Sequence, residues 1–257
     1  MKTDLSGKTA LITGGTSGIG RETAMQFAKA GARVVVAGRR ETEGEKTVEL
    51  VRAEGGQGFF VKADVSQGAE VEMLVKKTVD KFGRLDIAFN NAGIEGAWAP
   101  IAVQSEVDFD SVININLKGV WLCLKYEIRQ MMAQGGGVIV NMSSVAGLLG
   151  FAGAGAYIAS KHGVLGLTKT AALETAKSNI RVNAVCPAVV ETAMAERLFG
   201  APDIQKFVLG QHPIGRLGRP EEIANAVVWM CSDGASFMTG QSLVLDGGFT
   251  AGPNPPG

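Results

Sequence analysis

Short apolar runs alternate with longer amphipathic stretches along nearly the whole chain, and this alternation limits the fold more than any other feature. The apolar runs lie near residues 9–13, 33–37, 58–62, 85–90, 137–142, 180–186 and 242–245. Stretches with helical character lie between them, notably around 42–54, 70–82, 107–132, 157–177 and 221–231. Strands that alternate with helices predict a parallel sheet covered by helices on both faces. We therefore expect an α/β protein with a doubly wound sheet of about seven strands.

The first apolar run leads directly into a glycine-rich turn, which is followed by a helical stretch from Arg21 to Ala30. Such glycines let the backbone turn tightly and approach a pyrophosphate, which lies over a helix N-terminus where free N–H groups favour anions. A glycine-rich turn can be only a flexible connection, but its place between a buried strand and a helix favours phosphate binding. We expect a Rossmann fold that binds a dinucleotide through Gly14, Thr16, Ser17, Gly18, Ile19 and Gly20.

Nothing in the sequence indicates a second domain. The length of 257 residues is within the usual range of one α/β domain, and neither a low-complexity linker nor an internal repeat divides the chain. We expect one dinucleotide-binding and catalytic domain over 1–257. The tail 252–257, Gly-Pro-Asn-Pro-Pro-Gly, cannot continue a helix or a strand, because its prolines lack the backbone N–H.

The end of the second apolar run bears on which dinucleotide is bound. An NAD site usually has an acidic residue here for the adenosine ribose hydroxyls, but this chain has Gly38, followed by Arg39 and Arg40. A guanidinium suits a phosphate, so the pair favours NADP, with Arg39 as the candidate ligand and NAD still possible. Arg40 is equally well explained as a solvated loop charge.

A tyrosine and a lysine occur four residues apart in a helical stretch, at Tyr157 and Lys161. This spacing places them on one face of a helix, where a cation favours the phenolate and lowers the phenol's pKa from its usual ~10. Ser144 could hold a carbonyl or alcohol oxygen beside them. Tyrosine and lysine often occur at this spacing by chance, so the pair gains meaning only from the other motifs.

Taken together, these motifs make the chain similar to the short-chain dehydrogenase/reductase family along nearly its whole length. Residues from Thr13 to Gly20 match its cofactor loop, and Asp64-Val65 resembles its adenine-contacting pair. Further matches follow the fourth and sixth apolar runs or belong to the family's catalytic tetrad. They are Asn90, Asn91, Ala92, Gly93, Val190 and Thr192, and the tetrad Asn116, Ser144, Tyr157 and Lys161. Ser143 is chemically equivalent to Ser144, but the number of residues between the family's serine and its tyrosine matches Ser144.

The resemblance implies reversible hydride transfer between a nicotinamide cofactor and a carbonyl or secondary alcohol. Tyr157 would move the proton, Ser144 would hold the substrate oxygen, and Lys161 would lower the tyrosine pKa and hold the nicotinamide ribose. Asn116 would anchor a water that relays protons. The segment 190–215 corresponds to the family's substrate lid, and its apolar side chains favour an at least partly apolar substrate.

One position departs from the family pattern, and one segment extends the candidate site. Pro187-Ala188 stands where the family usually has Pro-Gly, which leaves the local backbone path open, because glycine tolerates angles that alanine does not. After Gly93, Glu95 and Trp98 are candidates for the rim of the substrate pocket.

Composition excludes several classes of function. Lysine plus arginine and aspartate plus glutamate both number 25, so no overall charge favours nucleic acid or a membrane. No apolar run approaches the ~20 residues of a membrane span, and no signal segment opens the chain. The three cysteines, Cys123, Cys186 and Cys231, are scattered in apolar sequence and predict buried free thiols, as in the cytoplasm. With two histidines and no C-x-x-C motif, we expect no metal site.

Assembly and alternative functions follow from the same resemblance. It implies a homotetramer in which helices around 107–132 and 157–177 pair between subunits, although a buried helix face looks the same in a monomer. The alternatives are an NAD-linked alcohol dehydrogenase, an epimerase or dehydratase, and a dinucleotide-sensing module without catalysis. The complete tetrad argues against a sensor, and the lack of room for a substrate domain argues against an epimerase or dehydratase.

Overall fold

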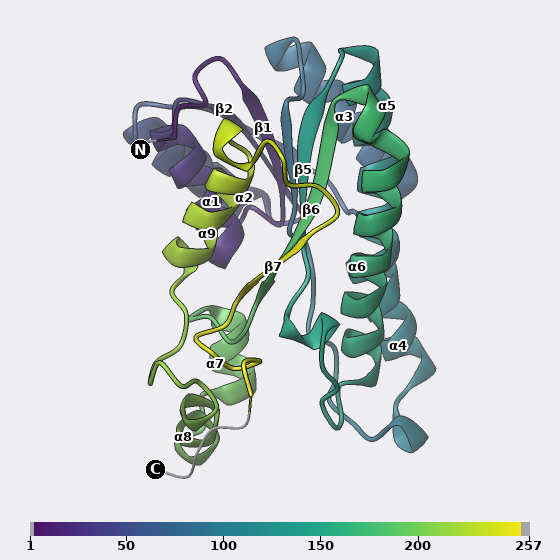
Figure 1. Cartoon of the computed structure of the whole chain (residues 1–257), viewed down its shortest axis with the longest axis vertical. Helices are drawn as coiled ribbons and strands as arrows, with labels where there is room; N and C mark the ends of the chain where they lie inside the picture. The colour runs from purple at the N-terminus through teal and green to yellow at the C-terminus, as the bar shows by residue number, and fades with distance from the viewer. Residues whose placement is uncertain (1–2, 253–257) are drawn as a thin grey trace.

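The computed structural model describes residues 3–252 and is built around one parallel sheet of seven strands in the order β3-β2-β1-β4-β5-β6-β7 (Figure 1). The strands are β1 (Thr9–Thr13), β2 (Arg33–Gly38), β3 (Gln57–Lys62), β4 (Ile87–Asn90), β5 (Gly137–Met142), β6 (Ile180–Pro187) and β7 (Ser242–Leu245). The doubly wound α/β fold expected from the sequence is confirmed. The order reverses direction between β1 and β4, which is where open sheets of this kind bind ligands.

The helices cover both faces of this sheet. They are α1 (Gly18–Lys29), α2 (Glu41–Ala53), α3 (Gly68–Phe82), α4 (Glu106–Ile113), α5 (Gly119–Ala133), α6 (Gly155–Thr175), α7 (Ala193–Phe199), α8 (Pro202–Gly210) and α9 (Pro220–Met230). Helices α1, α2 and α9 pack on one face around Phe27 and Phe89, and α3, α5 and α6 pack on the other around Leu74 and Ile139. The central strands are buried on both faces, which explains their continuous apolar sequence.

The long helical stretch expected at 107–132 is interrupted in the structure. Helix α4 ends at Ile113, a π-helical turn follows over Asn114–Lys118, and α5 begins at Gly119. A π turn inserts one extra residue into a helix, and such insertions are frequent at functional sites. Amphipathic periodicity did not reveal the interruption, because both halves bury apolar faces. The turn carries Asn116, one of the candidate catalytic residues.

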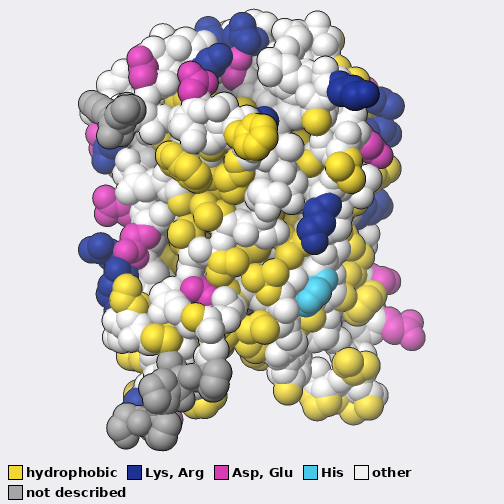
Figure 2. Space-filling view, in the orientation of Figure 1, with side chains coloured by type: hydrophobic (Ala, Val, Ile, Leu, Met, Phe, Trp, Pro, Cys, Tyr) yellow, Lys and Arg dark blue, Asp and Glu magenta, His cyan; other side chains and the backbone are white. Residues whose placement is uncertain are grey.

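Helices α7 and α8 lie beyond the carboxyl ends of the strands, at the lower left of Figure 1. No residue of α7 is buried, and Val208 is the only buried residue of α8. Opposite them, the α4 side of the molecule also extends past the sheet, and Figure 2 shows a notch between the two projections. The segment 190–215 therefore forms one wall of an opening at the carboxyl edge of the sheet.

The structure also bears on the expectations for the cysteines, for membrane spans and for the tail. Cys123, Cys186 and Cys231 are buried and unpaired, as expected. Among the described residues, no helix has the length and apolar character needed to cross a bilayer. Of the expected tail 252–257, only Gly252 is among the described residues, and 253–257 lie outside them.

Four buried polar side chains form a row of hydrogen bonds from α5 to α6, along the face of the sheet that these helices cover. Asn90 Nδ2 donates to Glu127 Oε2 at 2.9 Å and to Asn141 Oδ1 at 3.0 Å, and Asn141 Nδ2 donates to Thr168 Oγ1 at 3.0 Å. Glu127 Oε1 has no hydrogen-bond partner. Burial raises the pKa of Glu127 from 4.5 to about 7, although the hydrogen bond from Asn90 opposes the shift. The carboxyl group is therefore stable in its protonated form.

Replacing Glu127 with glutamine should change how stability depends on pH. Because the folded pKa is raised, the stabilisation by this group is complete below pH 4.5 and is lost as pH rises through about 7. Urea unfolding should therefore show that the free energy of unfolding of Glu127→Gln, relative to that of the parent protein, is higher at pH 8 than at pH 5 by up to roughly 3 kcal/mol. Glu49→Gln, which changes an exposed carboxylate on α2, is the control. A difference between Glu127→Gln and the parent that does not vary with pH would contradict the buried protonated carboxyl group.

Candidate active site

The glycine-rich turn leaves the N-terminus of α1 without a capping side chain. Ser17 occupies the N-cap position but makes no capping hydrogen bond, and the first turn contains no acidic residue. Gly14 and Gly18 have φ of 65° and 52°, in the left-handed region that glycine adopts without strain. The Arg21 guanidinium donates to the Thr16 carbonyl at 2.6 Å and holds the turn. The uncapped N–H groups face a position suited to an anion.

The segment after β4 packs against this turn and is hydrogen-bonded to it. Asn91 Nδ2 donates to the carbonyl groups of Thr13 and Gly14, at 3.1 and 3.2 Å. A Cβ atom at Gly14 would lie 2.8 Å from Ala92 Cα, and one at Gly20 would overlap the Gly14 carbonyl. Both glycines are therefore required by close backbone packing. The uncapped helix end and this close approach fit a dinucleotide pyrophosphate.

The end of β2 lacks the acidic residue of a typical NAD site. A Cβ atom at Gly38 would lie 2.7 Å from Thr16 Cγ2, so a larger residue there would have to push the Thr16 side chain aside. Arg39 is exposed and makes only a long ion pair with Asp64, at 3.9 Å. Arg40 donates to Thr16 Oγ1 at 2.9 Å and to Ser17 Oγ at 2.7 Å. The alternative of a merely solvated Arg40 is thus wrong, because its guanidinium is bound to the turn.

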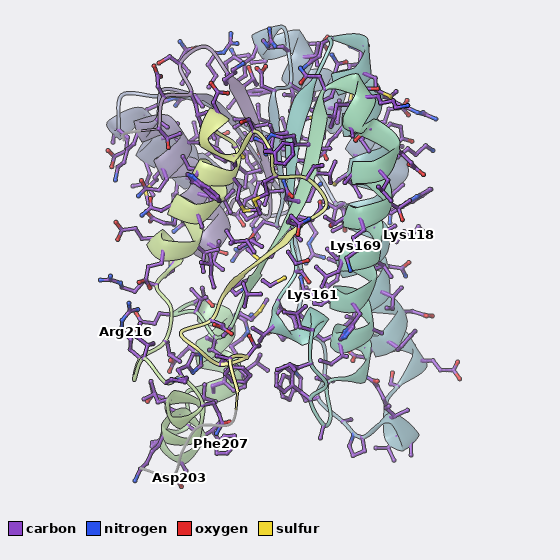
Figure 3. The ribbon with its side chains drawn as sticks, viewed as in Figure 1. Lys118, Lys161, Lys169, Asp203, Phe207 and Arg216 are labelled. Carbon is purple, nitrogen blue, oxygen red and sulfur yellow. The ribbon has the colours of Figure 1, made fainter. Side chains whose placement is uncertain are left out.

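The side chains of Ser144, Tyr157 and Lys161 meet at the carboxyl edge of the sheet, as the sequence predicted. Ser144 follows β5 and hydrogen-bonds the Tyr157 phenol. Lys161 is one helical turn further along α6, with Nζ at 5.4 Å from the centre of the tyrosine ring. Ser143 points elsewhere and donates to the Lys161 carbonyl at 3.0 Å. Lys161 lies in the interior of the molecule, whereas Lys118 and Lys169 lie on its outer side (Figure 3).

The pKa of Tyr157 differs in direction from the sequence-based expectation. Burial raises it to about 12, the hydrogen bond with Ser144 opposes the rise, and the Glu95 carboxylate adds to it. Lys161 is buried as well, and burial lowers the pKa of its ammonium group to about 8. A lysine with a weakened hold on its proton does not outweigh the loss of solvation of the phenolate. In this structure, without a bound ligand's charge, the expected lowering of the tyrosine pKa is therefore wrong.

Asn116 is buried in the π-helical turn and holds the segment that follows β4. Its Oδ1 accepts from Ile94 N and its Nδ2 donates to Ile94 O, both at 2.8 Å. A Cβ atom at Gly93 would lie 3.3 Å from Asn116 Oδ1 and 3.8 Å from Lys161 Nζ. Gly93 therefore lets the asparagine and the lysine approach from either side of the same short segment.

The remaining candidate residues border the same edge. Val190 is buried and pairs with Gly218, and Thr192 caps α7 by accepting from Ala195 N at 3.3 Å. A Cβ atom at Gly18 would lie 3.4 Å from Thr192 Cγ2, so the start of the segment 190–215 touches the glycine-rich turn. Val65 is buried against α5 and Asp64 accepts hydrogen bonds from Ser66, and both lie beside the end of β2.

The departure at Pro187-Ala188 has no structural cost. Among the described residues other than glycine, Asn179 alone has a positive φ, so Ala188 adopts ordinary backbone angles. Its N–H donates to the Leu245 carbonyl at 3.2 Å, which ties the end of β6 to β7. A glycine is not needed at this position.

Sequence reasoning missed the contacts that join the site to α7. Arg197 of α7 binds Glu95 at 2.8 Å, and the Trp98 ring meets the Phe199 ring edge-on at 5.8 Å between centres. Glu95 and Trp98 were candidates for the pocket rim, but their partners lie about a hundred residues away, and no pattern in the sequence connects them.

Comparisons with known proteins agree with this geometry. A family model described as enoyl-(acyl carrier protein) reductase matches residues 14–250. A 2,5-dichloro-2,5-cyclohexadiene-1,4-diol dehydrogenase of Sphingobium indicum is 45% identical, covering 96% of this chain and 99% of the relative. A cyclohexanol dehydrogenase of an Acinetobacter species is 41% identical, covering 98% of both chains. The solved structure of a short-chain type dehydrogenase/reductase from Mycobacterium marinum superposes with a TM-score of 0.93 at 35% identity, covering 97% of this chain and 98% of its own.

Proposed function

Because the chain belongs to the short-chain dehydrogenase/reductase family and is an oxidoreductase of alcohols and carbonyls, we propose that it interconverts an uncharged ring alcohol and its ketone, with NADP(H) favoured. One observation carries the proposal. Ser144, Tyr157 and Lys161 converge at the carboxyl edge of the sheet, beside a helix N-terminus suited to a pyrophosphate. A bound nicotinamide supplies or accepts the hydride, and the chain's own residues position the substrate and move the proton.

In this proposal, Tyr157 is the proton donor in reduction and the acceptor in oxidation. The Ser144 hydroxyl, which already bonds the phenol, would hold the substrate oxygen within reach of the same proton. Ser144 is itself held in place, since its Oγ accepts from Ala146 N at 3.1 Å. A phenol with a raised pKa keeps its proton at neutral pH, which suits donation to a carbonyl oxygen.

Lys161 and Asn116 would connect the Tyr157 phenol to solvent and supply it with protons. Lys161 Nζ donates to the Met142 carbonyl at 3.0 Å, which leaves further N–H groups for ribose hydroxyls. Because its pKa is lowered to about 8, this ammonium group can pass a proton on at moderately alkaline pH. Asn116 fixes the adjoining segment, and a water between it and Lys161 would link the pair to solvent.

Two features of the adenosine side support NADP over NAD. Gly38 supplies no carboxylate for the adenosine ribose, and Arg39 is exposed and only weakly paired. We assign Arg39 to the additional phosphate of NADP, with Asp64 and Val65 beside the adenine. Arg40 is assigned to the shape of the turn that either dinucleotide uses.

The substrate class rests on the lid and on the relatives. The Trp98 and Phe199 rings meet where α7 contacts the segment after β4, and the exposed Leu148 and Leu149 follow Ser144 closely in the sequence. An apolar opening of this kind suits an uncharged substrate with few polar groups. The two relatives named for cyclohexadiene-diol and cyclohexanol dehydrogenation make a six-membered ring the first choice. We assign the segment 190–215 to the lid over that ring.

We also propose a cytoplasmic homotetramer. Ile113, Leu117, Trp121 and Leu167 form an apolar surface between α4, α5 and α6, and Trp121 is 47% exposed. An exposed apolar patch of this kind is typical of a subunit interface. The buried free thiols suit a reducing compartment.

Removing the phenolic hydroxyl should abolish most turnover. Tyr157→Phe should lower kcat by a factor of ~100 to 10,000, the usual contribution of a general acid, with little change in NADPH affinity. Turnover is measured by nicotinamide absorbance with cyclohexanone as the first substrate, followed by an open-chain polyol and an acyl thioester. Tyr126→Phe changes the other tyrosine of the chain, on α5, and should retain activity. Undiminished turnover in Tyr157→Phe would contradict the assignment.

The two arginines after β2 should differ in their effect on cofactor binding. Arg39→Ala should weaken NADP binding by about tenfold or more, the value of a charge-assisted hydrogen bond, and leave NAD binding unchanged. Arg40→Ala should weaken both dinucleotides, because it releases the hydroxyls of Thr16 and Ser17. Titration calorimetry without substrate measures both. Equal losses for NADP and NAD in Arg39→Ala would remove its assignment to the phosphate.

The apolar surface should determine the oligomeric state. Light scattering should give four times the chain mass of 26.8 kDa, and Trp121→Glu should lower it by placing a charge on that surface. Met73→Glu changes an exposed residue of α3 and should leave the mass unchanged. A mass equal to one chain for the parent protein would refute the tetramer.

A further inference from the structure

An ion pair joins α7 to the segment that follows β4. Arg197 Nε and Nη2 both donate to Glu95 Oε1, at 2.9 and 2.8 Å. The Glu95 side chain is only 20% exposed, while that of Arg197 is 59% exposed. The carboxylate therefore belongs to the interior of the cleft, and the guanidinium reaches it from the solvent side.

A second contact lies beside the first. Trp98 and Phe199 meet edge-on at an interplanar angle of 82°, and each lies within three residues of its neighbour in the ion pair. Helix α7 has seven residues and none of them is buried, so it has little packing of its own to hold it in place. The ion pair and the ring contact therefore hold α7 in place where buried packing does not.

The side of the contact that carries Glu95 is firmly anchored. Ala97 N donates to both carboxylate oxygens of Asp108, at 3.1 and 3.0 Å. Ala99 N donates to the Gly153 carbonyl at 2.9 Å, and Ala99 forms a parallel bridge with Ala154, the residue before α6. The Glu95 segment is thereby tied to the start of the helix that carries Tyr157, so α7 is the partner free to move.

We propose that Glu95 and Arg197, together with Trp98 and Phe199, form a clasp that holds α7 over Tyr157, and that closing the clasp neutralises the carboxylate which this tyrosine faces. Glu95 and Arg197 are positioning residues, since neither needs to touch the reacting atoms. The statement about the tyrosine rests on the proposed function, whereas the statement about α7 does not.

The charges around Tyr157 make the second half of this proposal specific. Glu95 faces the phenol from the segment after β4, Lys161 from α6 and the Ser144 hydroxyl from the end of β5, and the Cys186 thiol of β6 lies beside Lys161. The Glu95 carboxylate raises the pKa of the tyrosine. Arg197 is the one cation that the described residues place on that carboxylate. With the clasp closed, Arg197 offsets part of this charge, and opening the clasp removes that offset.

Hydrogen exchange of the free enzyme tests the clasp without catalysis. Glu95→Gln and Arg197→Gln should each speed exchange of the amides of α7 by about fivefold, the upper range for an exposed ion pair. Arg197→Lys should restore part of the protection, and Lys76→Gln, which breaks an exposed ion pair on α3, should leave α7 unchanged. Unchanged exchange in both glutamine variants would overturn the clasp.

The pH profile of alcohol oxidation tests the charge at the tyrosine. Glu95→Gln removes the negative charge and should move the acidic limb of kcat, where the phenol becomes protonated and can no longer accept the proton, to lower pH. Arg197→Gln leaves the charge uncompensated and should move that limb to higher pH. Both variants break the ion pair and should therefore raise KM alike, whereas their pH profiles should shift in opposite directions. Shifts in the same direction, or none, would overturn the coupling. A parent protein without turnover on any substrate would refute the proposed function, and the exchange result would still decide the clasp.

Discussion

The close approach of two backbones at the carboxyl edge of the sheet is the constraint on which the site depends. The turn after β1 lies directly on the segment after β4, and there is no room for a Cβ atom at Gly14 or Gly20. The Asn91 amide donates to the carbonyl groups of Thr13 and Gly14, so hydrogen bonds as well as packing join the two strand ends. This contact presents the N-terminus of α1 to an anion and carries the chain on toward Gly93 and Glu95.

From that edge outward, packing becomes progressively looser. Lys161 and Asn116 are buried and have defined hydrogen bonds, Tyr157 buries its phenol but keeps part of its surface exposed, and α7 has no buried residue. Such a gradient is what the proposed function requires, with rigid groups for proton transfer and a cover that opens for substrate. Helix α7 contacts the segment after β4 through an ion pair and a pair of rings, and contacts of this kind can be broken at small cost.

The parts of the fold that could be predicted from sequence are those set by local pattern. Alternating apolar and amphipathic stretches gave the sheet, and the spacing of Tyr157 and Lys161 gave one face of α6. The π-helical turn at Asn116 could not be predicted, because no local pattern marks it and the side chain it positions bonds Ile94, which lies 22 residues away. Arg40 was uncertain for the same reason, since its partners Thr16 and Ser17 lie more than twenty residues away.

The pKa of Tyr157 shows where reasoning from residue types is incomplete. The sign expected from Lys161 is correct for two charges in isolation, but burial acts on both groups and favours the neutral form of each. A site that buries a phenol and an ammonium together keeps the first protonated and loosens the proton of the second. Burial is the main cause of the raised pKa of the phenol, the Ser144 hydrogen bond opposes it, and the nearby Glu95 carboxylate adds a smaller rise. Because that carboxylate is bound by Arg197 of α7, the proposed clasp would couple the position of α7 to the proton affinity of Tyr157.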